Sequence, residues 1–351
     1  MIRARRARRG WAAALAAMAL IGAGCSGGHA AQAAHSPVSA RGPGTASPPG
    51  RYLAADGTPP RLVVIDRVTG KVVKKLTPAE PGGGANSPTM PSSGSVLYFG
   101  QGDGTCGNNI LKVPVAGGTP VPGASLGLVD GAAMDEAGEA FSVRPDGRVL
   151  AVGRDNSCLP QEPSFTELAL IDTVSGAQVV TDTSVDGPAS DQAWSPDGTE
   201  LLTIRDNGID VRGASGGIEF HLLTLGSGEQ VTGDRTLSPA QAGCSYDSAL
   251  FSPSSGDVIA DLDCGLTGPS SLVELDPKTG AETDTVLSPQ PGVAVGAQAI
   301  DPSGVYLMYE TGPWPPSPTS TAVSWLVLDR SSGRSTPLAV PPGVVPGAWY
   351  P

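Results

Sequence analysis

The chain has 351 residues, including 48 glycines and 34 prolines; only 16% of its residues are charged, and its formal net charge is −12. This composition favours many short strands joined by tight turns over long solvated helices. The acidic balance argues against nucleic acid as a partner, because such binding needs clustered lysine and arginine. It argues equally against direct electrostatic attraction to anionic lipid.

The first 24 residues have the pattern of a signal peptide. Five arginines precede Gly10, and an apolar run extends from Trp11 to Ala23. That run is shorter than the roughly 20 residues that a membrane-spanning helix needs, so cleavage is expected rather than retention. Removal of residues 1–24 takes away five of the 22 basic residues and no acid, leaving 17 basic against 34 acidic residues.

The signal peptide ends in Ile21-Gly22-Ala23-Gly24-Cys25, which resembles a bacterial lipobox. The resemblance implies that Cys25 carries a lipid; the alternative is ordinary cleavage nearby, with full release of the protein. Residues 25–46 lack apolar periodicity and predict a flexible tether. The chain is therefore expected at the cell membrane, on the extracytoplasmic side, with residues 47–351 folded and membrane contact only through the lipid.

Two short motifs alternate six times along residues 47–351. The first is an apolar strand ending in a turn of the type Asp-x-x-Ser/Thr-Gly, with final glycines at Gly70, Gly118, Gly176, Gly228, Gly280 and Gly333. The second is a Pro/Gly turn followed by an apolar strand, with copies starting at Ser47, Met90, Arg144, Ser195, Ser252 and Asp301. One unit thus contains four strands joined by tight turns, which is an antiparallel blade.

The C-terminus repeats the start of an interior unit. Gly347-Ala348-Trp349-Tyr350-Pro351 matches Gln192-Ala193-Trp194-Ser195-Pro196, the inner strand and turn entry of another blade. The last strand is therefore expected to complete blade I and remove the free sheet edges. The predicted fold is all-β, a six-bladed β-propeller of four-stranded antiparallel blades closed by the C-terminal strand.

Two of the repeats carry a family resemblance. Ser195-Pro196-Asp197-Gly198 through Arg205-Asp206-Asn207, and Arg144-Pro145-Asp146-Gly147 through Arg154-Asp155-Asn156, resemble the signature of TolB-type, WD-repeat-like propellers. The resemblance extends over residues 47–351. It implies the scaffold but no particular activity, because such propellers serve many functions.

The blade pattern separates two faces of the predicted ring. The tight turns lie on one face (the turn face), and the longer loops and blade connections lie on the other (the loop face). Binding residues usually occupy variable loops on a rigid scaffold, so the loop face is the predicted binding surface. All four cysteines of the folded part fall there, and neighbouring positions favour Cys106–Cys158 and Cys244–Cys264 disulfides over the other two connectivities.

Strand ends that lead into the loop face carry one acid per blade. They are Asp56, Asp103, Asp155, Asp206, Asp263 and Glu310. A partial acidic ring at the mouth of the channel would attract a cation or a basic peptide. The alternative is that aspartate simply starts loops in an acidic protein. Tyr246 and Trp314 are the aromatic candidates for contact with a partner on this face.

Sequence motifs for catalysis are weak. Gly213-Ala214-Ser215-Gly216-Gly217 matches a nucleophile-elbow string, but no helix follows it, so no catalytic or metal-binding residue is assigned. The predicted function is a monomeric, non-catalytic scaffold that binds a protein, a peptide or another component of the cell envelope. A calcium-dependent propeller hydrolase or lyase that uses the channel-mouth acids is the alternative, and calcium is the only cofactor left open.

Overall fold

The computed structural model describes residues 48–57, 60–78, 85–91, 94–102, 108–124, 141–155, 166–182, 190–206, 218–238, 244–264, 270–313 and 323–351. Within these ranges the chain forms 24 strands and no helix. The same ranges contain no helix long and apolar enough to cross a membrane. Pro48–Pro351 forms one compact unit, and the predicted signal peptide, Cys25 and tether lie outside the described residues.

The strands form six four-stranded antiparallel sheets, the blades, in which the strands follow one another from the centre of the ring outward. Blade I contains β24 (Val344–Trp349), β1 (Arg51–Gly57), β2 (Pro60–Asp66) and β3 (Val72–Lys75). Blade II contains β4 (Ala85–Thr89), β5 (Val96–Gly102), β6 (Asn108–Pro114) and β7 (Val121–Ala124). Blade III contains β8 (Phe141–Val143), β9 (Val149–Asp155), β10 (Thr166–Asp172) and β11 (Gln178–Asp182).

The second half of the ring follows the same order. Blade IV contains β12 (Ser190–Trp194), β13 (Glu200–Asp206), β14 (Ile218–Leu225) and β15 (Val231–Leu237). Blade V contains β16 (Ser245–Phe251), β17 (Val258–Asp263), β18 (Ser270–Leu275) and β19 (Glu282–Leu287). Blade VI contains β20 (Val293–Ile300), β21 (Tyr306–Pro313), β22 (Ser324–Asp329) and β23 (Arg334–Pro337). These sheets confirm the predicted six-bladed propeller.

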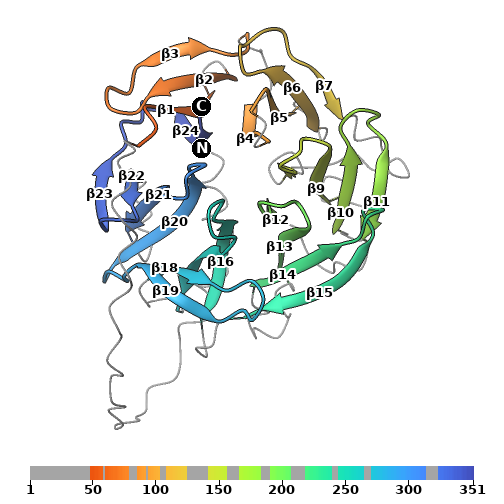
Figure 1. The fold of residues 1–351 in the computed structure, drawn as a ribbon. Coiled ribbons are helices and arrows are strands. Elements are labelled where there is room, and N and C mark those ends of the chain that lie inside the picture. The colour runs from red at the N-terminus through yellow and green to blue at the C-terminus, as the bar shows by residue number, and fades with distance from the viewer. Residues whose placement is uncertain are drawn as a thin grey trace, which may run out of the picture. The chain divides into compact units, whose positions relative to one another are not determined.

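The C-terminal strand closes the ring as the repeat predicts. β24 pairs with β1 in antiparallel register, with Trp349 opposite Tyr52 and Val344 opposite Asp56. In Figure 1 the six inner strands surround the centre of the ring, and β3, β7, β11, β15, β19 and β23 lie at its periphery. Blade I is thus built from both ends of the folded part, and it has four strands like the other five blades.

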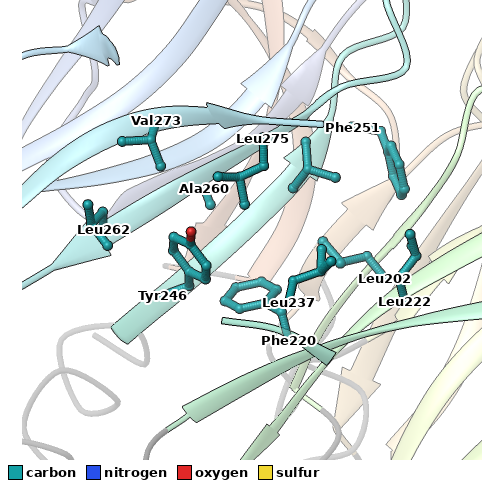
Figure 2. Packing of buried hydrophobic residues seen from close by; sticks show 11 residues of the cluster. Leu202, Phe220, Leu222, Leu237, Tyr246, Phe251, Ala260, Leu262, Val273 and Leu275 are labelled. Atoms are coloured by element: carbon teal, nitrogen blue, oxygen red, sulfur yellow. The ribbon is translucent and has the colours of Figure 1, made fainter. Parts of the chain in front are cut away.

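The core consists of apolar layers between neighbouring blades. Between blades IV and V, Phe220 of β14 lies beside Tyr246 of β16, and Leu222 of β14 and Leu262 of β17 belong to the same buried cluster (Figure 2). The rings of Phe220 and Tyr246 meet edge to face, with centroids 5.6 Å apart. Leu223, next along β14, packs instead towards blade III. Strands inside a blade are therefore buried on both faces, which explains their nearly continuous apolar sequence.

The Asp-x-x-Ser/Thr-Gly turns close hairpins by side-chain capping. In blade III, Asp172 accepts hydrogen bonds from the backbone NH and the hydroxyl of Ser175, both at 2.7 Å. Gly176 adopts φ +70°, a left-handed conformation that glycine takes without a steric cost. In blade IV the residue in this conformation is Glu229 (φ +63°), not the predicted Gly228. The prediction was wrong because this turn is one residue shorter: the NH of Gly226 bonds to the carbonyl of Gln230.

Candidate functional site

The loop face is described only in part. The connections from the second to the third strand of all six blades contain residues outside the described ranges. Asp103, Cys106, Cys158 and Trp314 belong to those connections, so the predicted Cys106–Cys158 pair and the predicted Trp314 anchor lie outside the described residues. The strands that lead into this face are described, and they place the remaining candidates.

The described acids lie in the second strand of their blades. Asp155, Asp206 and Asp263 end β9, β13 and β17, while Asp56 lies at the end of β1 and Glu310 lies within β21. The inner strands, not these second strands, surround the centre of the ring. The strands that carry these acids thus lie one position outward from the inner strands, and the acidic ring at the channel mouth stays a prediction.

Two of these acids contact their own blade. The Asp56 carboxylate accepts from the Arg61 guanidinium of the adjacent strand, at 3.0 and 3.1 Å. The Glu310 side chain lies over Gly296, where a Cβ atom would come within 3.1 Å of it. The ion pair with Arg61 holds the Asp56 carboxylate against the sheet. It gives Asp56 a structural role that sequence spacing does not reveal.

A polar cluster joins blades V and VI next to the loop face. Asp261 is 4% exposed; it accepts a hydrogen bond from the NH of Ala297 at 2.9 Å and another from the hydroxyl of Ser248. The Ser270 hydroxyl bonds to the backbone of Val295. A buried carboxylate with these donors links the two blades, because it replaces the water it lost with protein partners.

Asp263 follows Asp261 on the same face of β17, but its carboxylate has fewer hydrogen-bond partners. Its Oδ1 atom is buried and has no hydrogen-bond partner among the described residues. Burial raises the pKa of this carboxyl, and a hydrogen bond from the backbone of Cys264 opposes the rise only in part. The neutral form of Asp263 is therefore favoured relative to an exposed aspartate.

A disulfide ties the adjacent strand ends together. Cys244 and Cys264, which flank the Ser245–Asp263 pair of β16 and β17, are bonded as the cysteine positions predict. Tyr246, predicted to be an exposed anchor, is 3% exposed and belongs to the core between blades IV and V. Burial raises its pKa to about 12. That placement corrects the prediction, because a buried ring offers no surface to a partner.

Basic side chains in the described strands and turns reach across five of the six blade interfaces. From blade I round the ring, Lys74 donates to the carbonyl of Val115 (3.2 Å), Lys112 to the carbonyl of Thr173 (3.4 Å), Arg144 to Glu229 (2.6 Å), Arg235 to the carbonyl of Lys278 (2.7 Å) and Arg330 to Glu274 (2.8 Å). A lysine or arginine used in this way no longer offers its charge fully to solvent or to a partner. The scarce basic residues thus stabilise the ring.

The Arg144 contact lies beside a cleft on the turn face between blades III and IV. The cleft has a volume of about 350 Å³, and its walls include Arg144, Asp146, Asp197, Thr199 and Glu229. Arg144 pairs with both Asp146 and Glu229, and its guanidinium lies 5.8 Å from the centre of the Trp194 ring. A hydrogen bond from the Ser195 hydroxyl, with support from Thr199, lowers the pKa of Asp197. The carboxylates around the cleft all have partners within it.

Charge is distributed unevenly around the ring. The described part of blade I contains six basic and two acidic residues, a formal charge of +4. Blade IV contains two basic and seven acidic residues, or −5, and blade V contains one basic and eight acidic residues, or −7. Blade IV lies across the ring from blade I (Figure 1). The propeller therefore has a basic side at blade I and an acidic side at blades IV and V.

The acids of blades IV and V are dispersed, whereas a metal ion needs several ligands at one point. Across the described strands and turns, no group of three or more histidine, cysteine, aspartate or glutamate side chains is arranged to hold a metal ion. The acids are instead spread over turns, strand ends and outer strands. This distribution suits attraction of a positively charged partner over an extended surface.

No protein-family model matches the chain, and no curated protein matches it in sequence. A protein described as TolB from Agrobacterium tumefaciens aligns with a TM-score of 0.55 and 14% identity, over 82% of this chain and 88% of that one. An oligogalacturonate lyase in complex with manganese aligns with a TM-score of 0.53 and 13% identity, over 80% of this chain and 70% of that one. A chain of a nidogen/laminin complex aligns with a TM-score of 0.56 and 14% identity, over 85% of this chain and 96% of that one. At these identities the likeness shows the propeller fold alone, and it confirms the TolB-type resemblance at that level.

Proposed function

We propose that this chain is a lipid-anchored, extracytoplasmic propeller that binds a cationic segment of an envelope protein or peptide and catalyses no reaction. The fold leaves this choice open, because similar propellers include a lyase and a chain of a protein complex. The observation that carries the proposal is the excess of acidic residues on blades IV and V.

Blades IV and V have few cations of their own. The described part of blade V has a single basic residue, Lys278, and Arg235 of blade IV donates to the backbone of blade V. Arginines of the neighbouring blades neutralise Glu229 and Glu274, so the excess of negative charge rests on the remaining exposed acids. In the outer strand of blade V the exposed acids Glu282 and Asp284 alternate with the exposed threonines Thr283 and Thr285. A surface of this kind raises the local concentration of a positively charged partner and speeds its association, more so at low ionic strength.

The binding proposal is tested by titration calorimetry with an oligolysine peptide, at physiological and at high salt. Affinity is expected to fall with salt and in the Glu282→Gln/Asp284→Asn variant, whereas Lys278→Gln, which removes a positive charge from the same blade, should bind more tightly. Equal affinity of all three proteins would contradict the proposal. A calcium titration of the same samples checks the enzymatic alternative directly.

The anchor is tested separately by mass spectrometry of the protein expressed in a bacterial host. A diacylglyceryl group on Cys25 is expected after cleavage, together with recovery in the membrane fraction. Cys25→Ser is expected to release the protein from the membrane fraction on washing with high salt, which screens electrostatic contacts but does not remove a lipid anchor. An unmodified N-terminus at another residue would overturn the lipid anchor and leave the binding proposal untouched.

A further inference from the structure

The outer edge of blade I differs from the rest of the acidic surface. Its last turn and outer strand contain Lys71, Lys74 and Lys75, and the facing end of β1 contributes Arg51. Arg51, Lys71 and Lys75 are exposed, whereas Lys74 is directed to Val115 of blade II. Blade I thus retains three exposed cations after its structural contacts are made.

Apolar side chains lie among these cations. Val68, Val72 and Val73 expose 71%, 42% and 47% of their surface, although valine is ordinarily buried. We call the set formed by Arg51, Val68, Lys71, Val72, Val73 and Lys75 the basic edge. Its outer strand, β3, lies at the periphery of the ring (Figure 1), where no other described strand covers it.

The other outer strands do not share this character. β19 carries Glu282 and Asp284 without a cation, β11 carries Asp182 without a cation, β15 contains one acid (Asp234) and one cation (Arg235), and β7 has no charged residue. β23 of the neighbouring blade VI contains Arg334 and no acid, so it extends the basic character in one direction. β7 and β11 each expose a valine as well, Val121 and Val179, but carry no cation, so the combination of several cations with exposed valines on one outer strand is particular to blade I.

We propose that the basic edge docks on a membrane surface containing anionic phospholipid. Lysine and arginine near such a surface each contribute about 1 kcal/mol of attraction, and exposed valines favour the boundary between headgroups and acyl chains. The partner is a lipid surface because cations and exposed valines occur together on one outer strand and the turn before it, from Val68 to Lys75. A soluble polyanion would attract the cations but would not bury the exposed valines.

The sequence brings this edge close to the membrane. Blade I begins directly after residues 25–46, the predicted tether, so this part of the inference rests on the proposed function. A flexible segment of that length has a root-mean-square reach of about 25 Å. Tethering at such a distance raises the effective concentration of lipid at the edge, and docking then becomes an intramolecular event.

The overall negative charge of the chain does not prevent this contact. Charges are screened over about 8 Å at physiological ionic strength. Two four-stranded sheets on opposite sides of a ring span about 30 Å even without the channel between them, given strand spacings near 4.8 Å. The acids of blade IV are therefore several screening lengths from the basic edge. Docking would also leave the acidic side facing away from the membrane, towards an incoming partner.

The test uses the processed chain from residue 25 with Cys25→Ser, so that no acyl chain contributes to binding. Sedimentation with vesicles of phosphatidylcholine alone is compared with vesicles that also contain phosphatidylglycerol. Binding is expected only to the anionic vesicles. The Lys71→Gln/Lys75→Gln variant should lower the partition coefficient roughly 30-fold. The matched control Arg148→Gln/Lys278→Gln removes two exposed cations from other blades and should leave it unchanged.

Three results would overturn the inference: no preference for anionic vesicles, equal losses in the two double variants, or binding to soluble polyglutamate without binding to vesicles. Circular dichroism and melting temperatures check that the variants are folded, which is expected because the substituted side chains are exposed. Since the protein in this test has no lipid, the result is independent of whether Cys25 is acylated. Failure of the anchor and failure of the basic edge are thereby distinguished.

Discussion

The Arg144 guanidinium of blade III donates to both carboxylate oxygens of Glu229 in blade IV, at 2.6 and 2.7 Å. Glu229 reaches this position in a left-handed backbone conformation, φ +63°, which costs a non-glycine residue about 1 kcal/mol. Glu229 thus combines an unfavourable backbone conformation with a favourable ion pair. A double-mutant cycle is needed to measure the two contributions to the free energy of unfolding separately.

Glu229→Gly is expected to stabilise the Arg144→Gln background by about 1 kcal/mol, because it relieves the backbone without removing an ion pair. In the wild-type background the same substitution should give no gain or a net loss, since a hydrogen-bonded charge pair contributes roughly 1.5–3 kcal/mol. Urea unfolding of the four proteins measures both effects. An identical gain in both backgrounds would show that the ion pair contributes nothing.

Blades I and II are joined by a contact between distant parts of the chain. The Tyr350 hydroxyl donates to the carbonyl of Val115 at 3.0 Å and lies 3.3 Å from the Lys74 ammonium. Tyr350→Phe should lower the free energy of unfolding by about 1 kcal/mol and speed hydrogen exchange in β24 and β1. Lys74→Met in the Tyr350→Phe background should cost less than in the wild type, because the two share one network. Additive losses would argue against that network.

The Cys244–Cys264 disulfide closes a loop with a sequence separation of 20 residues. In the chain-entropy description, a loop of this size contributes about 3 kcal/mol by restricting the unfolded chain. Cys244→Ala/Cys264→Ala should therefore lower stability by about that amount while leaving the circular dichroism spectrum unchanged. Non-reducing peptide mapping of the exported protein checks the bond itself, and recovery of both cysteines as free thiols would refute it.

Asp263 makes stability depend on pH in an unusual direction. Because burial raises the pKa of its carboxyl, the folded protein holds this proton more tightly than the unfolded chain. The resulting stabilisation is complete below the unfolded pKa, near 3.9, and is lost as the pH rises through the folded pKa. Asp263→Asn should therefore stabilise the protein at pH 7 by about 1 kcal/mol, with a smaller gain as the pH falls towards 4.

Asp261→Asn is the matched control for that measurement. Asp261 accepts hydrogen bonds from the NH of Ala297 and the hydroxyl of Ser248 in a buried position. In Asp261→Asn the amide oxygen can keep the bond from Ala297 and the Ser248 hydroxyl must turn to accept from the amide nitrogen, so both bonds lose their charged acceptor. We expect a loss of about 2 kcal/mol at pH 7. Thermal unfolding of both variants at pH 7 and near pH 4 distinguishes them. A destabilising Asp263→Asn at pH 7 would contradict the unsatisfied environment described for Asp263.

The fold could be predicted because its turns depend on local chemistry. Asp172 and Gly176 form their turn with atoms only a few residues apart, so the same letters recur wherever the same turn is needed. Repetition at a nearly constant spacing then predicts the blade, the number of blades and the closure by β24. The misplaced turn at Glu229 arose because Ser227-Gly228 imitates the motif although this hairpin closes one residue earlier than the Asp172 turn; the turn of blade II, where the NH of Gly117 bonds to the carbonyl of Pro114, is short in the same way.

The burial of single side chains and the pairing of charges depend on contacts between blades, which the sequence does not show. Sequence alone made Tyr246 a candidate anchor, and only the packing of blade IV against blade V buries it. The sequence also shows a run of cations at Lys71–Lys75, yet it cannot tell that Lys74 reaches the carbonyl of Val115 while Lys71 and Lys75 stay exposed. The strands, the turns and the order of the blades could be predicted from the amino-acid sequence, because they depend on neighbours along the chain. Which charges are used internally and which face outward became clear from the folded structure, because their partners lie in another blade.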